Sequence, residues 1–175
     1  MHEHLPRLDS ENYRGFASVH WTLAVDDRAT GWLDERFHFC WREVLLHALA
    51  RYALFCPAYC LMPDHAHLVW IGVAETSDQR NAMKFFRTNM APLLAPRSWQ
   101  RQAHDHVLRD QEKGTDAFGT ICNYVFENPV RKGLNAKWQE YPFLGAMVPG
   151  HPGLDPRRDE FWEKFWRIYN AKMGG

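Results

Sequence analysis

Two apolar runs on either side of a Pro-Asp pair constrain the fold of this chain more than any other feature. Residues 53–62, ALFCPAYCLM, and residues 65–73, HAHLVWIGV, each have the length and apolar character of a strand. Pro63 has the fixed φ that a tight turn requires, and Asp64 can accept local backbone hydrogen bonds. The two runs therefore predict a β-hairpin, and we interpret Asp64 as a turn residue.

The rest of the chain predicts strands and helices around this hairpin. Residues 16–25 are rich in β-branched and aromatic residues, whereas apolar residues recur at helical spacing through residues 33–52. The remaining predicted elements are a helix at 77–95, a strand at 105–109 and a helix that begins near Asp116. This order predicts a ferredoxin-like α+β fold with one added helix, in which helices pack on an antiparallel sheet.

Capping and helix-breaking residues predict where the helices begin and end. Asp34 is a candidate N-cap for the first helix, and Ser77 is one for the second. Pro92 and Pro129 lack the amide proton that a helix interior needs. We therefore expect the second and third helices to end or bend at these two prolines.

Length and composition predict a single globular domain. The chain has 175 residues, and 46% of them are hydrophobic, which suffices for one well-buried core. Residues 150–175 are expected to form an extension with a short amphipathic helix. The large apolar residues of that helix are Phe161, Trp162, Phe165 and Trp166.

The cysteines and the apolar runs predict a soluble cytoplasmic protein. Four cysteines, Cys40, Cys56, Cys60 and Cys122, lie in apolar segments, which favours reduced and buried thiols over disulfides. No apolar run approaches the roughly 20 residues of a membrane helix. The segment MHEHLPRLDSENYRG lacks the layout of a signal peptide.

Basic residues are concentrated in the middle of a chain whose formal net charge is zero. Residues 80–109 contain six basic and one acidic side chain, interleaved with Phe85, Phe86 and Trp99. Such a surface attracts phosphate groups and offers rings on which bases can stack. An ordinary solvated helix face has the same composition, so the block alone does not establish a nucleic-acid partner.

Two histidines share one face of the predicted second hairpin strand. Side chains alternate along a strand, so His65 and His67 project together, with Cα atoms roughly 7 Å apart. Two imidazoles at this spacing can bind one cation. They can equally be ordinary polar positions on a half-exposed strand, and a partner from elsewhere is needed to decide.

The candidate partner lies in the third helix, in the segment ICNYVFENPVRKGL. Tyr124 and Asn128 are four residues apart and so lie on one helix face. They could supply a nucleophile and an oxygen ligand. Alternatively, Tyr124 is a core aromatic residue and Asn128 ends the helix.

Four segments together resemble the single-tyrosine, His-hydrophobic-His transposases. They are LMPDHAHLVW, the basic helix with Lys84, SWQRQAHDHVLRD and YVFENPVRKGL, and the resemblance spans roughly residues 14–145. The branch they resemble most is the transposase-like proteins associated with repetitive extragenic palindromes (REPs). Departures from this pattern are Asp64, where many relatives have Asn, and the first strand, SVHWTLAV.

The resemblance implies a site and a reaction. His65, His67 and Asn128 would bind a divalent metal, and Tyr124 would attack single-stranded or hairpin DNA, leaving a 5′-phosphotyrosine link and a free 3′-hydroxyl. With no thiolate and an oxygen donor in this set, Mg²⁺ or Mn²⁺ is favoured over a closed zinc site. The implied DNA-binding residues are Lys84, Arg87, Trp99, Gln100, His106, Arg109, Arg131 and Lys132.

Two other functions remain open from the sequence. The same fold could hold DNA or RNA hairpins without cutting them. An unrelated hydrolase could bind zinc through His65 and His67 and use Tyr124 only structurally. A homodimer is possible, and the sequence does not indicate whether the tyrosine helix would serve its own subunit or its neighbour.

Overall fold

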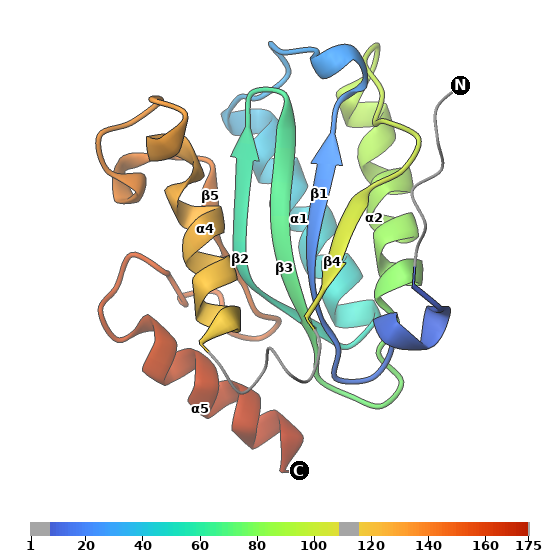
Figure 1. The fold of residues 1–175 in the computed structure, drawn as a ribbon, viewed down its shortest axis with the longest axis vertical. Coiled ribbons are helices and arrows are strands. Elements are labelled where there is room, and N and C mark those ends of the chain that lie inside the picture. The colour runs from blue at the N-terminus through green and yellow to red at the C-terminus, as the bar shows by residue number, and fades with distance from the viewer. Residues whose placement is uncertain (1–7, 109–115, 175) are drawn as a thin grey trace.

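The computed structural model describes residues 8–108 and 116–174, and these form an antiparallel sheet covered by helices (Figure 1). The strand order is β4-β1-β3-β2-β5. The strands are β1 (Ser18–Ala24), β2 (Leu54–Met62), β3 (His65–Gly72), β4 (His104–Val107) and β5 (Leu144–Met147). The helices are α1 (Glu35–Arg51), α2 (Gln79–Leu94), α4 (Ala117–Arg131) and α5 (Phe161–Met173). The ferredoxin-like α+β prediction is confirmed.

The predicted hairpin lies in the middle of the sheet as β2 and β3. Every residue of both strands is buried, because helices cover both faces of the sheet. This explains why the two runs are continuously apolar rather than alternating. Pro57, which cannot donate a ladder hydrogen bond, lies where the register shifts between Phe55 and Ala58.

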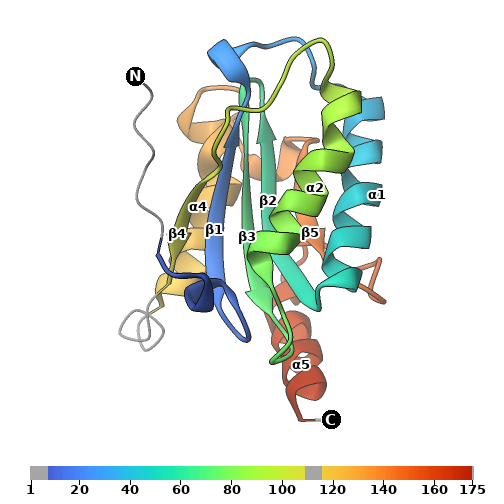
Figure 2. The same cartoon turned by 90° about the vertical axis from the view of Figure 1, so that its right-hand side faces the viewer.

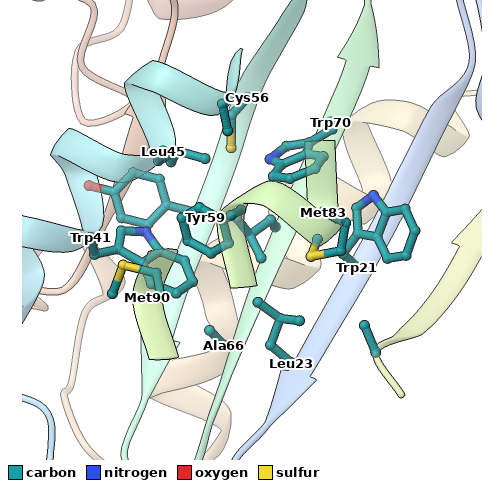
Figure 3. Close-up of a cluster of buried hydrophobic side chains, with 14 of the residues drawn as sticks. Trp21, Leu23, Trp41, Leu45, Cys56, Tyr59, Ala66, Trp70, Met83 and Met90 are labelled. Carbon is teal, nitrogen blue, oxygen red and sulfur yellow. The ribbon is translucent and has the colours of Figure 1, made fainter. Parts of the chain in front are cut away.

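Helices α1 and α2 lie together on one side of the sheet, and α4 lies on the other (Figure 2). The core between the sheet and α1 and α2 contains three fully buried tryptophans, Trp21, Trp41 and Trp70 (Figure 3). Each of these large aromatic side chains removes a large apolar area from water. This layer therefore fixes one face of β1 and β3 and leaves the opposite face available for a site.

Helix α4 packs on the opposite face, over β2 and β3. Val125 and Phe126 of α4 join a second buried cluster with Cys60 and Val69 of the strands. His65, His67 and Val69 are at every second position of β3, so they share one face of the strand. Their side chains therefore project toward the α4 side of the sheet. In Figure 1, α4 lies toward β2 and β5 and away from β4.

Several predicted element ends are wrong, while others are confirmed. Asp34 caps α1, and its carboxylate accepts a hydrogen bond from the Phe37 amide at 2.7 Å. The N-cap of α2 is Asp78 rather than Ser77, because the Ser77 hydroxyl donates instead to the Ala53 carbonyl at 2.6 Å.

Neither proline ends its helix. Helix α2 continues past Pro92 to Leu94, whose side chain is buried in the core. Helix α4 continues past Pro129 to Arg131, and Pro129 is itself buried. In each case one lost amide hydrogen bond is offset by the burial of a nearby side chain.

The C-terminal region is more ordered than its sequence suggests. Strand β5 falls in a segment for which no strand was predicted, and it pairs with β2. Helix α5 packs on the sheet through Phe165, which is fully buried beside Phe55, whereas Trp166 is 37% exposed. No helix in the described part of the chain is long and apolar enough to cross a membrane.

Candidate active site

The two histidines of β3 point their Nε2 atoms toward each other. His65 Nε2 and His67 Nε2 are 3.1 Å apart, and both side chains are buried. Two nitrogen ligands of one cation at bond lengths of about 2.1 Å lie about 3.0–3.4 Å apart when they are adjacent in its coordination shell. This is also the distance of the direct contact between the two nitrogens, so the geometry is compatible with a shared cation and leaves metal binding a prediction.

Asp64 has a role that the sequence did not indicate. Its Oδ1 is 2.6 Å from His65 Nδ1, and its Oδ2 accepts a hydrogen bond from Arg28 at 3.2 Å. Burial opposes ionisation of this carboxyl, but the hydrogen bond from His65 and the Arg28 charge outweigh it and lower the pKa of Asp64. A carboxylate can only accept, so it holds a proton on His65 Nδ1 and orients the ring with Nε2 toward the site. The interpretation of Asp64 as only a turn residue is wrong.

Strand β1 contributes two further side chains beside His67. His67 Nδ1 is 3.0 Å from His20 Nε2 and 3.2 Å from Thr22 Oγ1. Burial is the main cause that lowers the pKa of His67 to about 2 and that of His20 to about 4. Both imidazoles are thus neutral at physiological pH, and the neutral imidazole is the form that binds metals.

Tyr124 of α4 lies over this group rather than in the core. Its ring centroid is 5.8 Å from that of His67 and 6.0 Å from that of His20, and 38% of the residue is exposed. The Arg131 guanidinium lies 4.6 Å from the Tyr124 ring centroid. The structure therefore brings the solvent-accessible Tyr124, the Arg131 guanidinium and the histidine pair together.

Asn128 lies one helical turn from Tyr124 and is almost completely buried. Its Nδ2 donates to the Tyr124 carbonyl at 3.0 Å, which leaves Oδ1 as the side-chain atom that could serve as a ligand. Among the described residues, no group of three or more His, Cys, Asp or Glu side chains could hold a metal ion. The histidine pair therefore needs an amide oxygen, substrate or water to complete a coordination shell.

No protein-family model matches the chain. A curated protein of Haemophilus influenzae named "Putative REP-associated tyrosine transposase" is 23% identical over 140 residues, which cover 70% of this chain and 75% of the relative. A solved structure of a REP-associated tyrosine transposase bound to a REP hairpin superposes with a TM-score of 0.68 at 17% identity, covering 81% of both chains. This chain has the fold of a REP-associated tyrosine transposase.

On this transposase fold, the predicted DNA-binding residues do not form one surface. His106 lies directly across from His20 in the β1–β4 pairing and is exposed, so it shares the face of the histidine pair. Arg131 and Lys132 lie at the exposed end of α4. Arg109 falls outside the described residues.

Trp99 and Gln100, two other predicted DNA-binding residues, are held by contacts within the protein. Trp99 is only 9% exposed, and its ring packs against Trp32 and Trp41 in the core. Stacking of a DNA base on Trp99 is therefore a wrong prediction. Gln100 is partly exposed, and its backbone amide donates to the Ala24 carbonyl at 2.9 Å.

Lys84 and Arg87 lie on α2, across the sheet from the histidine pair. They line a hollow of about 710 Å³ together with Arg14 and Arg80. The Arg87 guanidinium donates to the backbone carbonyls of residues 100 and 101, so it fastens the segment after α2 to the helix. Lys84 is exposed, which leaves its ammonium group accessible to a phosphate.

These positions predict different defects for the two basic residues of α2. Lys84→Ala is expected to weaken DNA binding for all sequences and to reduce the salt slope of binding by about 1. Arg87→Ala is expected to lower the free energy of unfolding by about 1.5–3 kcal/mol, because it removes charged hydrogen bonds to the backbone. Salt-dependent binding and urea unfolding measure the two effects, with Lys172→Ala as a distant control. Equal loss of stability in Lys84→Ala and Arg87→Ala would contradict the assignment of Lys84 to phosphate binding and of Arg87 to structural stability.

Proposed function

We propose that this protein is a metal-dependent nuclease and transposase of single-stranded DNA that cuts and rejoins strands through a 5′-phosphotyrosine intermediate. The observation that carries the proposal is the position of Tyr124, whose exposed ring lies beside His67 of a pair with Nε2 atoms 3.1 Å apart. A tyrosine next to a potential cation site is the arrangement that phosphate attack needs.

His65 and His67 would hold Mg²⁺ or Mn²⁺, with Asn128 Oδ1 as a further oxygen ligand. Two neutral imidazoles and one amide leave several positions for phosphate oxygens and water, which suits a catalytic rather than a structural metal. When bound, the cation polarises the scissile phosphate and stabilises the charge that develops on it. A tyrosine hydroxyl, with an ordinary pKa near 10, needs this assistance to react at neutral pH.

The proposed reaction has two transesterification steps. In the first, the Tyr124 hydroxyl loses its proton and its oxygen bonds to phosphorus, while the bond from phosphorus to the 3′ oxygen breaks. The 3′ oxygen takes up a proton and leaves as a free 3′-hydroxyl. In the second, a 3′-hydroxyl attacks the phosphotyrosine, and Tyr124 regains its proton. Because each step exchanges one phosphoester bond for another, joining requires no nucleotide cofactor.

Hairpin-forming DNA repeats are the proposed substrate. The support is the fold shared with a transposase whose structure contains a REP hairpin. The exposed cations on α2 and at the end of α4 would position phosphates on the two sides of the sheet. The target sequence would be set by contacts other than those of the four site residues.

A cleavage assay tests this proposal. The full chain is incubated with an end-labelled single-stranded hairpin in Mg²⁺, Mn²⁺, Zn²⁺ or EDTA, and covalent and free products are separated under denaturing conditions. We expect a protein–DNA adduct in Mg²⁺ or Mn²⁺ and none in EDTA. Tight hairpin binding without cleavage in any metal would instead identify a hairpin-binding module. Zinc-dependent turnover of a substrate other than nucleic acid would support the hydrolase.

We further propose that one chain builds a whole site, whether or not the protein dimerises. The ring spacing between Tyr124 and His67 within a single chain supports this. Mixing Tyr124→Phe with His65→Ala protein is therefore expected to give no more adduct than either variant alone. Recovery of about a quarter or more of wild-type activity, the random-mixing expectation for a dimer with exchanged helices, would indicate a site shared between subunits.

A further inference from the structure

A hollow separate from the proposed active site lies between α5 and the region where α1 ends and β2 begins. Its volume is about 560 Å³, within the roughly 300–1,000 Å³ typical of small-molecule sites. Neither the histidine pair nor Tyr124 lines it. The hollow is therefore a candidate for a second binding site, independent of the proposed cation and nucleophile.

The floor of the hollow is apolar. It is lined by four residues that are each at most 5% exposed, namely Leu49, Leu54, Phe55 and Val73. Ile168 of α5 also lines it and packs against the same buried cluster as Phe55 and Val73. None of these side chains has a donor or an acceptor, so a polar group placed on them would lose its hydrogen bonds to water and gain no side-chain partner. The floor therefore suits an aliphatic chain and disfavours a nucleobase, whose edges need hydrogen-bond partners.

The rim of the hollow is basic. His151, Arg167 and Lys172 line it and are exposed, and among the described residues no Asp or Glu lines it. Arg167 pairs with Glu163 at 3.6 Å, but both side chains are well exposed, so this pair neutralises little of the charge. Lys172 forms no ion pair in the part of the chain that the structure describes. A basic rim around an apolar floor is complementary to an amphipathic anion.

We propose that this hollow binds an aliphatic carboxylate, with its chain on the apolar floor and its carboxylate at the rim beside Arg167 and Lys172. The proposal goes beyond the DNA reaction and depends on neither the metal nor Tyr124. An uncharged chain would bind through the floor alone, and the rim would repel a chain with a cationic head. These three kinds of ligand therefore distinguish the contributions of floor and rim.

Methyl NMR of the labelled full chain tests the proposal, with sodium decanoate as the probe at concentrations where it is monomeric. We expect decanoate to shift the methyl signals of Leu49, Leu54 and Ile168, which line the hollow, and not those of Leu23, which is buried elsewhere in the core. Each buried methylene raises affinity by about fourfold, so decanoate, with two more than octanoate, should bind on the order of 10-fold more tightly.

Three outcomes of this experiment would overturn the proposal. One is a spectrum that stays unchanged up to the concentration at which decanoate forms micelles, and another is a set of shifts confined to residues away from the hollow. The third is a shift of the same methyl signals when the ligand-free protein is diluted, which would identify a second copy of the chain as the occupant.

Decanol and decylammonium separate the role of the charge from that of the chain. Decanoate is expected to bind about 2–10-fold more tightly than decanol, because its carboxylate meets the exposed cations of the rim. Decylammonium is expected to bind most weakly of the three. Equal affinity for all three probes would show that the rim does not recognise a carboxylate.

Charge reversal at the rim gives a second, independent measurement. Arg167→Glu and Lys172→Glu are each expected to weaken decanoate binding by about 3–10-fold and to leave decanol binding nearly unchanged. A general disturbance of α5 would weaken both ligands equally. Lys164→Glu is the matched control, because Lys164 lies on the same helix, pairs with Glu160 at 2.9 Å and does not line the hollow. An equal loss of decanoate affinity in Lys164→Glu would overturn the assignment of the carboxylate to the rim.

Discussion

Tyr124→Phe is expected to reduce covalent attachment to DNA below detection while leaving DNA binding close to that of wild type. The substitution removes only the hydroxyl oxygen, and the ring contacts of Tyr124 with His67, His20 and Arg131 remain possible. Loss of the covalent nucleophile of a serine protease lowers turnover by on the order of 10⁶-fold, and we expect an effect of comparable size. Denaturing electrophoresis of labelled hairpin and a parallel binding titration measure the two quantities.

Tyr52→Phe is the matched control for this experiment. Tyr52 follows the end of α1, on the face of the sheet away from the histidine pair, and packs against Phe85. The Tyr52→Phe variant should form the covalent adduct with DNA as the wild type does. Cleavage by Tyr124→Phe at the wild-type rate would show that Tyr124 is not the nucleophile.

Replacement of either histidine of the pair has the second largest expected effect. His65→Ala and His67→Ala each remove one of the two imidazoles whose Nε2 atoms face each other. Loss of one group that stabilises the developing charge is expected to slow cleavage by on the order of 10²–10³-fold. Cleavage rates in Mg²⁺ and Mn²⁺, with calorimetric Mn²⁺ titration of each variant, measure this.

His104→Ala controls for a general effect of losing an imidazole from this face. His104 is exposed on β4 and lies across from Thr22. The His104→Ala variant should therefore cleave DNA as the wild type does. If His65→Ala and His67→Ala both retain full activity and full metal dependence, the cation is held elsewhere.

The sequence was sufficient to predict the central hairpin, the helices around it and the shared face of His65 and His67. These features depend on local patterns, namely apolar runs, a turn pair and strand alternation. The resemblance to transposases then linked the pair to Tyr124 across 57 residues, which no local pattern could do. The structure confirms that the two elements meet.

Other features depended on which strands become neighbours. His20 and Thr22 face His67 only because β1 pairs with β3, and a single strand sequence does not reveal its partner or register. The one sequence signal for this role was that His20 and Thr22, two residues apart, share a face of the predicted strand at 16–25. Trp99 was misassigned for a similar reason, since an aromatic residue in a basic segment suits a DNA contact or a core equally well.

Local signals also misled at the helix ends. Ser77 is a good cap by type, but its hydroxyl bonds the Ala53 carbonyl, and Asp78 takes the capping position. Pro129 was expected to end or bend α4, but the helix continues to Arg131 and the residue is buried. In both places tertiary contacts outweigh a local preference worth about 1–3 kcal/mol.

We propose that Tyr124 and the histidine pair form one site that cuts DNA. The most direct test is to trap the adduct of wild-type protein with a single-stranded hairpin in Mn²⁺, digest it with protease and locate the modified residue by mass spectrometry. We predict a 5′-phosphate ester on Tyr124, formed in Mn²⁺ and absent in EDTA. A nucleotide on any other residue, or cleavage with no covalent adduct, would show that Tyr124 is not the nucleophile.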